Sequence, residues 1–298
     1  MAQIRANGIT LEYDEHGPHD GVPFLFINGF GSQMTNWPEE FHQAMAKAGY
    51  RYIRFDNRDV GLSHKFDAAG PADIGAIMAA RAAGKSTSAA YNLNDMANDA
   101  AGVLEALGIG RAHIVGASMG GMIAQMVAAN HPHKTLSLTS IMSSTGNPAL
   151  PPAKPEAMAI LMTRPTSTDL EVLAAQSVKS AAIIGSPKYP ANEAEIRARF
   201  LADYQRAYYP VGVTRQMAAV MASGDRRDAL RKIKVPTMVV HGIDDPLVPI
   251  DGGRDTAAVI PGAELREIPG MGHDLPAPLF GMIVDAVETV ARKARVSA

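Results

Sequence analysis

The fold is decided by one stretch near the middle of the chain, which reads His113-Ile114-Val115-Gly116-Ala117-Ser118-Met119-Gly120-Gly121. We expect its first three residues to form a short buried strand and a helix to open near Met119. A serine in such a sharp strand-to-helix turn has a strained backbone that lifts its hydroxyl above the sheet. Gly116 and Gly120 lie two residues to either side, where a larger side chain would collide as strand and helix converge. The G-x-S-x-G pattern also occurs in ordinary glycine-rich turns, but its position between strand and helix predicts that Ser118 is a nucleophile.

Strands and helices alternate on both sides of this turn. Asn7-Gly8, between two segments that alternate apolar and polar residues, predicts an opening antiparallel hairpin. A continuous apolar run such as Phe24-Leu25-Phe26-Ile27 is typical of a strand buried on both faces. Further elements are expected as strands at 50–55, 136–142, 235–241 and 263–268, and as helices at 38–48, 93–107 with Asn94 as its cap, 122–129, 250–260 and 278–295. Repeated strand–helix units predict an α/β fold, with a mostly parallel central sheet and helices on both faces.

The alternation stops between residues 147 and 223. This segment is rich in proline, methionine and alanine, and it has patches of helical periodicity but no convincing strand. Because the strand pattern continues on both sides, we interpret 147–223 as a helical cap inserted into a core formed by 1–146 and 224–298. Four methionines in or near helical patches suggest a hydrophobic substrate, although such a stripe is also typical of plain core: Met158, Met162, Met217 and Met221.

A serine hydroxyl becomes a good nucleophile only when a neighbouring base takes its proton, and an acid must orient that base. His273 lies in Pro269-Gly270-Met271-Gly272-His273, directly after an expected strand, and Asp245 follows another. Because the carboxyl ends of parallel strands meet at one sheet edge, these side chains are predicted to approach Ser118. The chain order Ser, Asp, His is the order expected of this architecture.

Competing residues at these positions are less suitable. The adjacent Asp244 is the alternative acid, while Asp274 is expected to face solvent because neighbouring side chains rarely face each other. The loop 143–146, the other plausible location for the acid, contains no carboxylate. The remaining eight histidines are interpreted as structural or solvated: His16, His19, His42, His64, His113, His131, His133 and His241.

The negatively charged intermediate of acyl transfer needs hydrogen-bond donors, usually backbone N–H groups. The residue after the nucleophile, Met119, is expected to supply one. The loop Asn28-Gly29-Phe30-Gly31 follows a buried strand, and we place the second donor at Phe30. Taken alone, that loop could equally be an ordinary turn between a strand and a helix. Its combination with the turn at Ser118 favours a role as an oxyanion donor.

Composition excludes several other functions. The 298 residues have a formal net charge of -2, so no nucleic-acid partner is expected. The absence of cysteine excludes disulfides, a thiolate nucleophile and zinc–thiolate sites. The first residues lack the apolar stretch of a signal peptide, and no apolar run approaches the roughly 20 residues that cross a bilayer, so we expect a cytoplasmic protein. No metal or organic cofactor is expected, and a homo-oligomer remains possible.

These motifs together resemble the α/β-hydrolase superfamily over essentially the whole chain. The run 112–125 is similar to its nucleophile elbow, and 268–273 to its histidine loop. The run 235–242, followed by Asp245-Pro246, is similar to its acid-bearing strand and loop. Within the superfamily the chain looks most like the aclacinomycin-methylesterase-type esterases. The segments that carry this likeness are 36–41, 54–63 and the Pro-Gly-Met-Gly-His loop. The resemblance implies hydrolysis of a small-molecule carboxylic ester, with a helical cap that shapes the pocket.

The chain departs from the family pattern in two loops. Asn28-Gly29 stands where many members have His-Gly, and Arg58-Asp59 stands where Arg-Gly is common. We expect Asp56 and Arg58 to brace their loop as a pair. The segment 70–88 is longer than usual and predicts either a small amphipathic helix over the site mouth or a cover for the core.

The predicted mechanism is two-step acyl transfer through an acyl-enzyme. The same residues would also serve a lactonase, a carbon–carbon hydrolase or a cofactor-free perhydrolase. A small-molecule receptor built on a hydrolase scaffold is the non-enzymatic alternative, and it would bind tightly without turnover.

Overall fold

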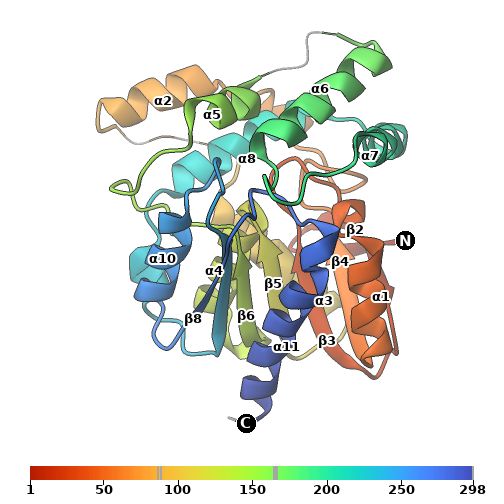
Figure 1. Cartoon of the computed structure of the whole chain (residues 1–298). Helices are drawn as coiled ribbons and strands as arrows, with labels where there is room; N and C mark the ends of the chain where they lie inside the picture. The colour runs from red at the N-terminus through yellow and green to blue at the C-terminus, as the bar shows by residue number, and fades with distance from the viewer. Residues whose placement is uncertain (86, 88, 164–166, 297–298) are drawn as a thin grey trace.

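The computed structural model describes residues 1–85, 87, 89–163 and 167–296. In this part of the chain, eight strands form one sheet in the order β1-β2-β4-β3-β5-β6-β7-β8 (Figure 1). β1 and β2 form the antiparallel hairpin, and the strands from β4 to β8 in that order are parallel. The strands are β1 Ala2–Ala6, β2 Ile9–His16, β3 Val22–Ile27, β4 Tyr50–Phe55, β5 Ala112–Ala117, β6 Thr135–Ile141, β7 Thr237–Gly242 and β8 Glu264–Ile268.

Apolar residues on both faces of the central strands hold helices against the sheet. Along β3, Phe24 and Phe26 belong to one hydrophobic cluster and Leu25 and Ile27 to the other, and all four side chains are fully buried. The first cluster packs under α1 (Glu39–Lys47) and α11 (Phe280–Val296), and the second under α3 (Leu93–Ala106) and α4 (Met119–Asn130). Burying each such side chain contributes roughly 2 kcal/mol, so the two faces fix the register of the sheet. The predicted mostly parallel sheet with helices on both faces is confirmed.

The N-cap of one helix differs from the prediction. Asn94 was the expected cap, but Asn92 is the N-cap of α3, and its side chain accepts hydrogen bonds from the N–H groups of Asn94 and Asp95. Asp95 in turn accepts a hydrogen bond from the N–H of Asn92, which completes a capping box. Asn94 lies inside the first turn. Several polar residues flank Leu93, and only the reciprocal pair distinguishes the true cap.

The segment between β6 and β7 is helical wherever it has regular structure in the described residues. Its helices up to residue 223 are α5 (Pro155–Met162), α6 (Leu170–Ile184), α7 (Glu193–Arg206) and α8 (Pro210–Ser223). Figure 1 shows them, in green to cyan, over one end of the sheet. Hydrogen bonds from Gly31 to Gln216, from His273 to Ile184 and from Lys154 to Pro246 join this segment to loops that follow β3, β8 and β7. The segment therefore lies over the carboxyl ends of the parallel strands.

The segment 70–88 contributes one more helix beside this group. α2 (Ile74–Ala82) buries Ile74 and Ile77 against Ala218 of α8, while Met78 is 53% exposed. α2 therefore covers α8 rather than the core under the sheet; residues 86 and 88 lie outside the described residues. The remaining helices are α9 (Arg227–Leu230) and α10 (Ile250–Val259), with 3-10 turns at Met34–Asn36, Asp67–Ala69, Pro132–Lys134 and Ala277–Leu279. Among the described residues, no helix has the length and apolar character that crossing a bilayer requires.

Candidate active site

Ser118 occupies the turn between β5 and α4 in a strained conformation. Its φ is +56° and its ψ is -123°, a region that residues with a side chain rarely adopt. A Cβ on Gly116 would lie 2.0 Å from the carbonyl oxygen of Gly120, and one on Gly120 would lie 2.1 Å from that of Ile27. Both glycines are therefore required for the close approach of strand and helix.

The structure brings His273 and Asp245 to this serine. His273 Nε2 lies 2.9 Å from Ser118 Oγ, and His273 Nδ1 lies 2.7 Å from Asp245 Oδ2. A carboxylate can only accept, so Nδ1–H donates to Asp245 and Nε2 is free to accept from the serine hydroxyl. The three groups form one chain of hydrogen bonds across loops that follow β5, β7 and β8.

His273 and Asp245 are each held in place by further hydrogen bonds with backbone groups. The other oxygen of Asp245 accepts hydrogen bonds from the N–H groups of Leu247 and Val248, at 2.9 and 2.8 Å. The N–H of His273 donates to the carbonyl of Ile184 at the end of α6, at 2.7 Å. The imidazole is therefore positioned by the acid loop and by the helical segment together.

Phe30 and Met119 lie where oxyanion donors are expected, beside Ser118 in the same cavity. Among the described residues, neither backbone N–H has a protein acceptor. A Cβ on Gly29 would lie 3.2 Å from Ser118 Cβ, which shows how closely this loop approaches the serine. Free N–H groups so close to the hydroxyl can stabilise a developing negative charge.

Asn28 supports the loop after β3 through hydrogen bonds of its side chain and its backbone carbonyl. Its Nδ2 donates to the carbonyl of Gln33 at 2.8 Å, and its own carbonyl accepts from Asn57 Nδ2 at 2.9 Å. These bonds tie both ends of the loop to each other and to the segment after β4. Asparagine at this position thus braces the turn without a histidine.

The competing groups have other partners. Asp244 Oδ2 accepts from the N–H of Gly270, at 2.7 Å. His241 Nε2 donates to the carbonyl of Val248, at 2.8 Å, and burial lowers its pKa. His113 is buried with its Nδ1 2.7 Å from Ser137 Oγ.

Asp274 does not face solvent, and that prediction is wrong. Its carboxylate accepts a hydrogen bond from Ser186 Oγ, it is half-buried, and it lines the cavity that contains Ser118. Burial raises its pKa. The preceding residue, His273, turns toward Ser118, while Asp274 turns toward the loop after α6, so adjacent residues serve different partners.

Asp56 and Arg58 do not pair with each other, contrary to the sequence prediction. Arg58 binds Asp99 of α3 through two hydrogen bonds of 2.6 and 2.7 Å. Asp56 forms an ion pair with Arg206 of α7, at 2.8 Å, and accepts from the N–H of Met34. Both residues still brace their loop, but their partners lie far away in sequence.

A cavity of about 390 Å³ opens onto Ser118 and His273. Its other lining groups are mainly apolar, including Trp37, Met122, Met158, Leu161, Met217 and Val220. Met158 and Met217 come from the helical segment, as the methionine pattern suggested, whereas Met221 packs in the small cluster between α2 and α8. Among the described residues, no group of three or more His, Cys, Asp or Glu side chains could hold a metal ion.

The comparisons with known proteins agree with this architecture. The family described as alpha/beta hydrolase fold matches residues 22–276, so the chain belongs to the alpha/beta hydrolase family. Two rhodomycin D methylesterases, from a Streptomyces species and from Streptomyces peucetius, are 28% and 26% identical to it, and each match covers 98% of both proteins. An enol-lactonase structure from Burkholderia xenovorans superposes with a TM-score of 0.67 at 19% identity and covers 99% of this chain and 98% of that one. Family and relatives support a hydrolase.

Proposed function

We propose that the protein is a serine hydrolase that cleaves a carboxylic ester through an acyl-enzyme on Ser118. The observation that carries the proposal is the unbroken chain from Asp245 Oδ2 to His273 Nδ1, at 2.7 Å, and from His273 Nε2 to Ser118 Oγ, at 2.9 Å. Such a chain supplies a nucleophile, its base and the group that fixes the base in the correct tautomer.

The first half of the reaction forms the acyl-enzyme. Ser118 Oγ attacks the ester carbonyl as its proton passes to His273 Nε2. The N–H groups of Met119 and Phe30 stabilise the oxyanion, each by roughly 3 kcal/mol of barrier. The intermediate then collapses, the bond from carbon to the alcohol oxygen breaks, and His273 returns the proton to the departing alcohol.

The second half regenerates the enzyme. Water attacks the acyl carbonyl and gives a proton to His273 Nε2. A second oxyanion forms and is stabilised by the same N–H donors. The bond from carbon to Ser118 Oγ breaks, the serine recovers a proton from His273, and the carboxylic acid leaves. Asp245 stays ionised and stabilises the imidazolium in both halves.

We further propose that 147–223 acts as a cap over the core formed by 1–146 and 224–298, and that the substrate is hydrophobic. The mainly apolar lining from both parts supports this, because charged groups would be costly to desolvate there. The relatives described as methylesterases favour a methyl ester, whose small alcohol would leave most of the cavity to the acyl part.

The decisive comparison is hydrolysis of p-nitrophenyl esters of increasing acyl length by the wild-type protein and by Ser118→Ala. We expect at least about a thousandfold loss of kcat in the variant, because the hydroxyl forms the covalent intermediate. Circular dichroism and thermal unfolding of the two proteins provide the folding control. Equal turnover by both proteins would remove Ser118 as the nucleophile.

A lactone is the second candidate substrate, and the enol-lactonase neighbour favours including it. A lactone is a cyclic ester, so the same steps open its ring and keep both products in one molecule. Hydrolysis of a five-membered lactone with kcat/KM above that of its open-chain methyl ester would favour this candidate; the reverse order would favour the open-chain ester.

A further inference from the structure

The loop that carries His273 lies against the loop at the end of α6. The N–H of His273 donates a hydrogen bond to the carbonyl of Ile184, at 2.7 Å. A Cβ on Gly272 would lie 2.3 Å from the carbonyl oxygen of Gly185. Glycine at position 272 therefore permits an approach of the two backbones that a larger residue would prevent.

One buried hydroxyl group links the residues on both sides of His273. The N–H of Gly272 donates to Ser186 Oγ at 2.9 Å, and the hydroxyl of Ser186 donates to the carboxylate of Asp274. Ser186 is 3% exposed, so little solvent reaches these bonds. Because a hydroxyl can accept and donate at one atom, it holds the backbone before and after the imidazole at the same time.

Loss of this hydroxyl would leave the N–H of Gly272 and the carboxylate of Asp274 without their shared partner. Burial raises the pKa of Asp274, and hydrogen bonding with Ser186 opposes that rise. Buried polar groups that lose a partner are costly, so both residues would move toward new partners. Since His273 lies between them, its ring would leave the position in which Nε2 is 2.9 Å from Ser118 Oγ.

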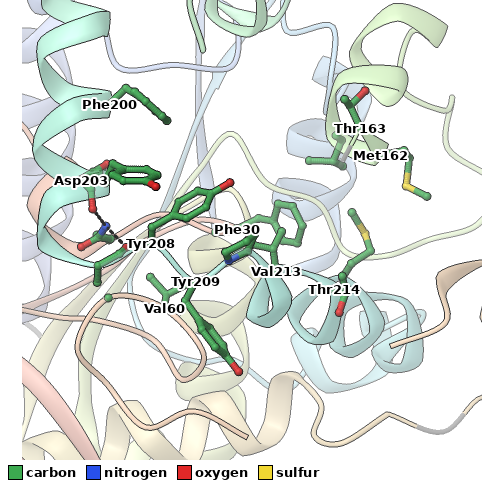
Figure 2. Close-up of a pocket in the computed structure, with 18 of the residues that line it drawn as sticks. Phe30, Val60, Met162, Thr163, Phe200, Asp203, Tyr208, Tyr209, Val213 and Thr214 are labelled. Atoms are coloured by element: carbon green, nitrogen blue, oxygen red, sulfur yellow. Dashed lines mark hydrogen bonds between the residues drawn. The ribbon is translucent and has the colours of Figure 1, made fainter. Parts of the chain in front are cut away.

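The helical segment has further attachments to the core that do not involve Ser186. Figure 2 shows Asp203 of α7 in the wall of a neighbouring cavity of about 360 Å³, where its backbone carbonyl accepts from Gln33 Nε2 at 2.7 Å. Gln216 of α8 accepts from the N–H of Gly31 at 2.8 Å. These contacts keep α7 and α8 on the core, so a change at Ser186 should affect the loop of the base without releasing the segment.

We propose that Ser186 is a positioning residue that holds His273 within reach of Ser118. It acts through its hydrogen bonds to Gly272 and Asp274. This inference rests on the proposed function, because it assigns Ser186 to the base of that reaction. Ser186 lines neither cavity, so its loss should affect the chemical step and leave substrate binding almost unchanged.

The test compares Ser186→Ala with the wild type in the hydrolysis of a p-nitrophenyl ester. We expect a loss of about tenfold in kcat with less than about a twofold change in KM, because small displacements of a catalytic group slow the chemical step. Turnover is expressed per active site, and the sites are counted by mass spectrometry after complete reaction with a fluorophosphonate. A residue that only stabilised the fold would change the number of sites and not the turnover of each one.

Ser180→Ala is the matched control, because Ser180 lies on α6 itself and donates within that helix, to the carbonyl of Gln176. It should keep the wild-type kcat per site. Ser186→Thr retains the hydroxyl and should exceed Ser186→Ala in kcat per site by about threefold or more. Ser186→Cys retains the volume, but sulfur is a weak donor and acceptor, so it should lose about threefold or more against the wild type. This variant provides the measurement if Ser186→Ala does not fold.

Failure of this inference is distinguishable from failure of the proposed function. A kcat per site within about twofold of the wild type in each folded variant of Ser186 would overturn the inference while Ser118 still took the label. A smaller number of sites with unchanged kcat per site, or an increase in KM alone, would overturn it as well. A wild-type protein without a label on Ser118 would instead overturn the proposed function, and the inference with it.

Discussion

At the scale of single residues, Ser118 holds a backbone conformation that only its surroundings can maintain. Its positive φ is stabilised by a hydrogen bond from its N–H to the carbonyl of Ile141 and by the convergence of β5 and α4 at Gly116 and Gly120. The motif therefore requires Gly116 and Gly120 for steric reasons, and this requirement can be tested without any substrate.

Gly116→Ala should destabilise the fold strongly, because its Cβ would meet the backbone of Gly120, which cannot move without shifting α4. We expect a loss of about 3 kcal/mol or more in the free energy of unfolding, measured by urea denaturation. Gly110→Ala is the control, since a Cβ there meets nothing within 4 Å. Similar stabilities for both variants would contradict this steric account.

Asp245→Asn should leave the fold intact but lower kcat by about three to four orders of magnitude, because the amide no longer fixes the tautomer of His273. Asp244→Asn is the neighbouring control. Its carboxylate binds the N–H of Gly270 and does not contact His273. Equal loss of kcat in both variants would remove the orienting role of Asp245.

At the scale of elements, Gln216 links α8 to the loop after β3 through hydrogen bonds of its side chain. Its Oε1 accepts from the N–H of Gly31 at 2.8 Å, its Nε2 donates to the carbonyl of Arg58 at 2.9 Å, and its side chain is fully buried. The helical segment therefore also holds the loop that carries the proposed donor at Phe30.

Gln216→Leu should lower kcat by about tenfold for short and long esters alike, with a smaller change in KM, since a loosened donor loses transition-state stabilisation. Ser223→Ala is the control on the same helix, because it instead removes the hydrogen bond that the N–H of Leu93 donates to Ser223 Oγ. A change in KM alone would show that Gln216 acts through the pocket and not through the loop.

The buried ion pair of Arg215 with Asp59, at 2.6 and 2.8 Å, is a second link, and it joins α8 to the segment after β4. Tyr91 also donates to Asp59, at 2.7 Å. Burial alone would raise the pKa of this carboxyl, but the hydrogen bonds from Arg215, Phe66 and Tyr91 outweigh it and leave the pKa of Asp59 lowered. Removing one partner leaves a buried charge, so Arg215→Met should cost about 3 kcal/mol at neutral pH.

The same pair predicts a pH dependence of stability. Because the folded pKa of Asp59 is below the ordinary value of 3.8, its contribution is complete above that value and is lost as the pH falls through the folded pKa. The stability gap between wild type and Asp59→Asn should therefore be constant from about pH 5 to 7 and shrink in stronger acid. Urea titrations across that range measure it. A gap that grows in acid would contradict the ion pair.

At the scale of the whole molecule, local patterns predicted the sheet well because each strand carries its own signal. The run Phe24 to Ile27 is apolar on both faces, and Asn7-Gly8 permits only a tight turn, so neither depends on distant residues. The proximity of Ser118, Asp245 and His273 could be predicted because parallel strands bring their carboxyl ends to one edge.

The remaining contacts have no local signal. Arg206 and Arg215 reach Asp56 and Asp59 across about 150 residues, so their pairing follows from how the helical segment lies on the core. Asp274 shows the same limit, because its partner Ser186 belongs to the loop after α6.

The proposed reaction depends on a covalent intermediate that Ser118 forms with help from His273. The most direct measurement is mass spectrometry of the intact and digested protein after reaction with a fluorophosphonate, applied to the wild type, Ser118→Ala and His273→Ala. We expect one adduct, on the peptide that contains Ser118, absent in Ser118→Ala and formed far more slowly in His273→Ala. An adduct on another residue of the wild type, or equal labelling in Ser118→Ala, would contradict it.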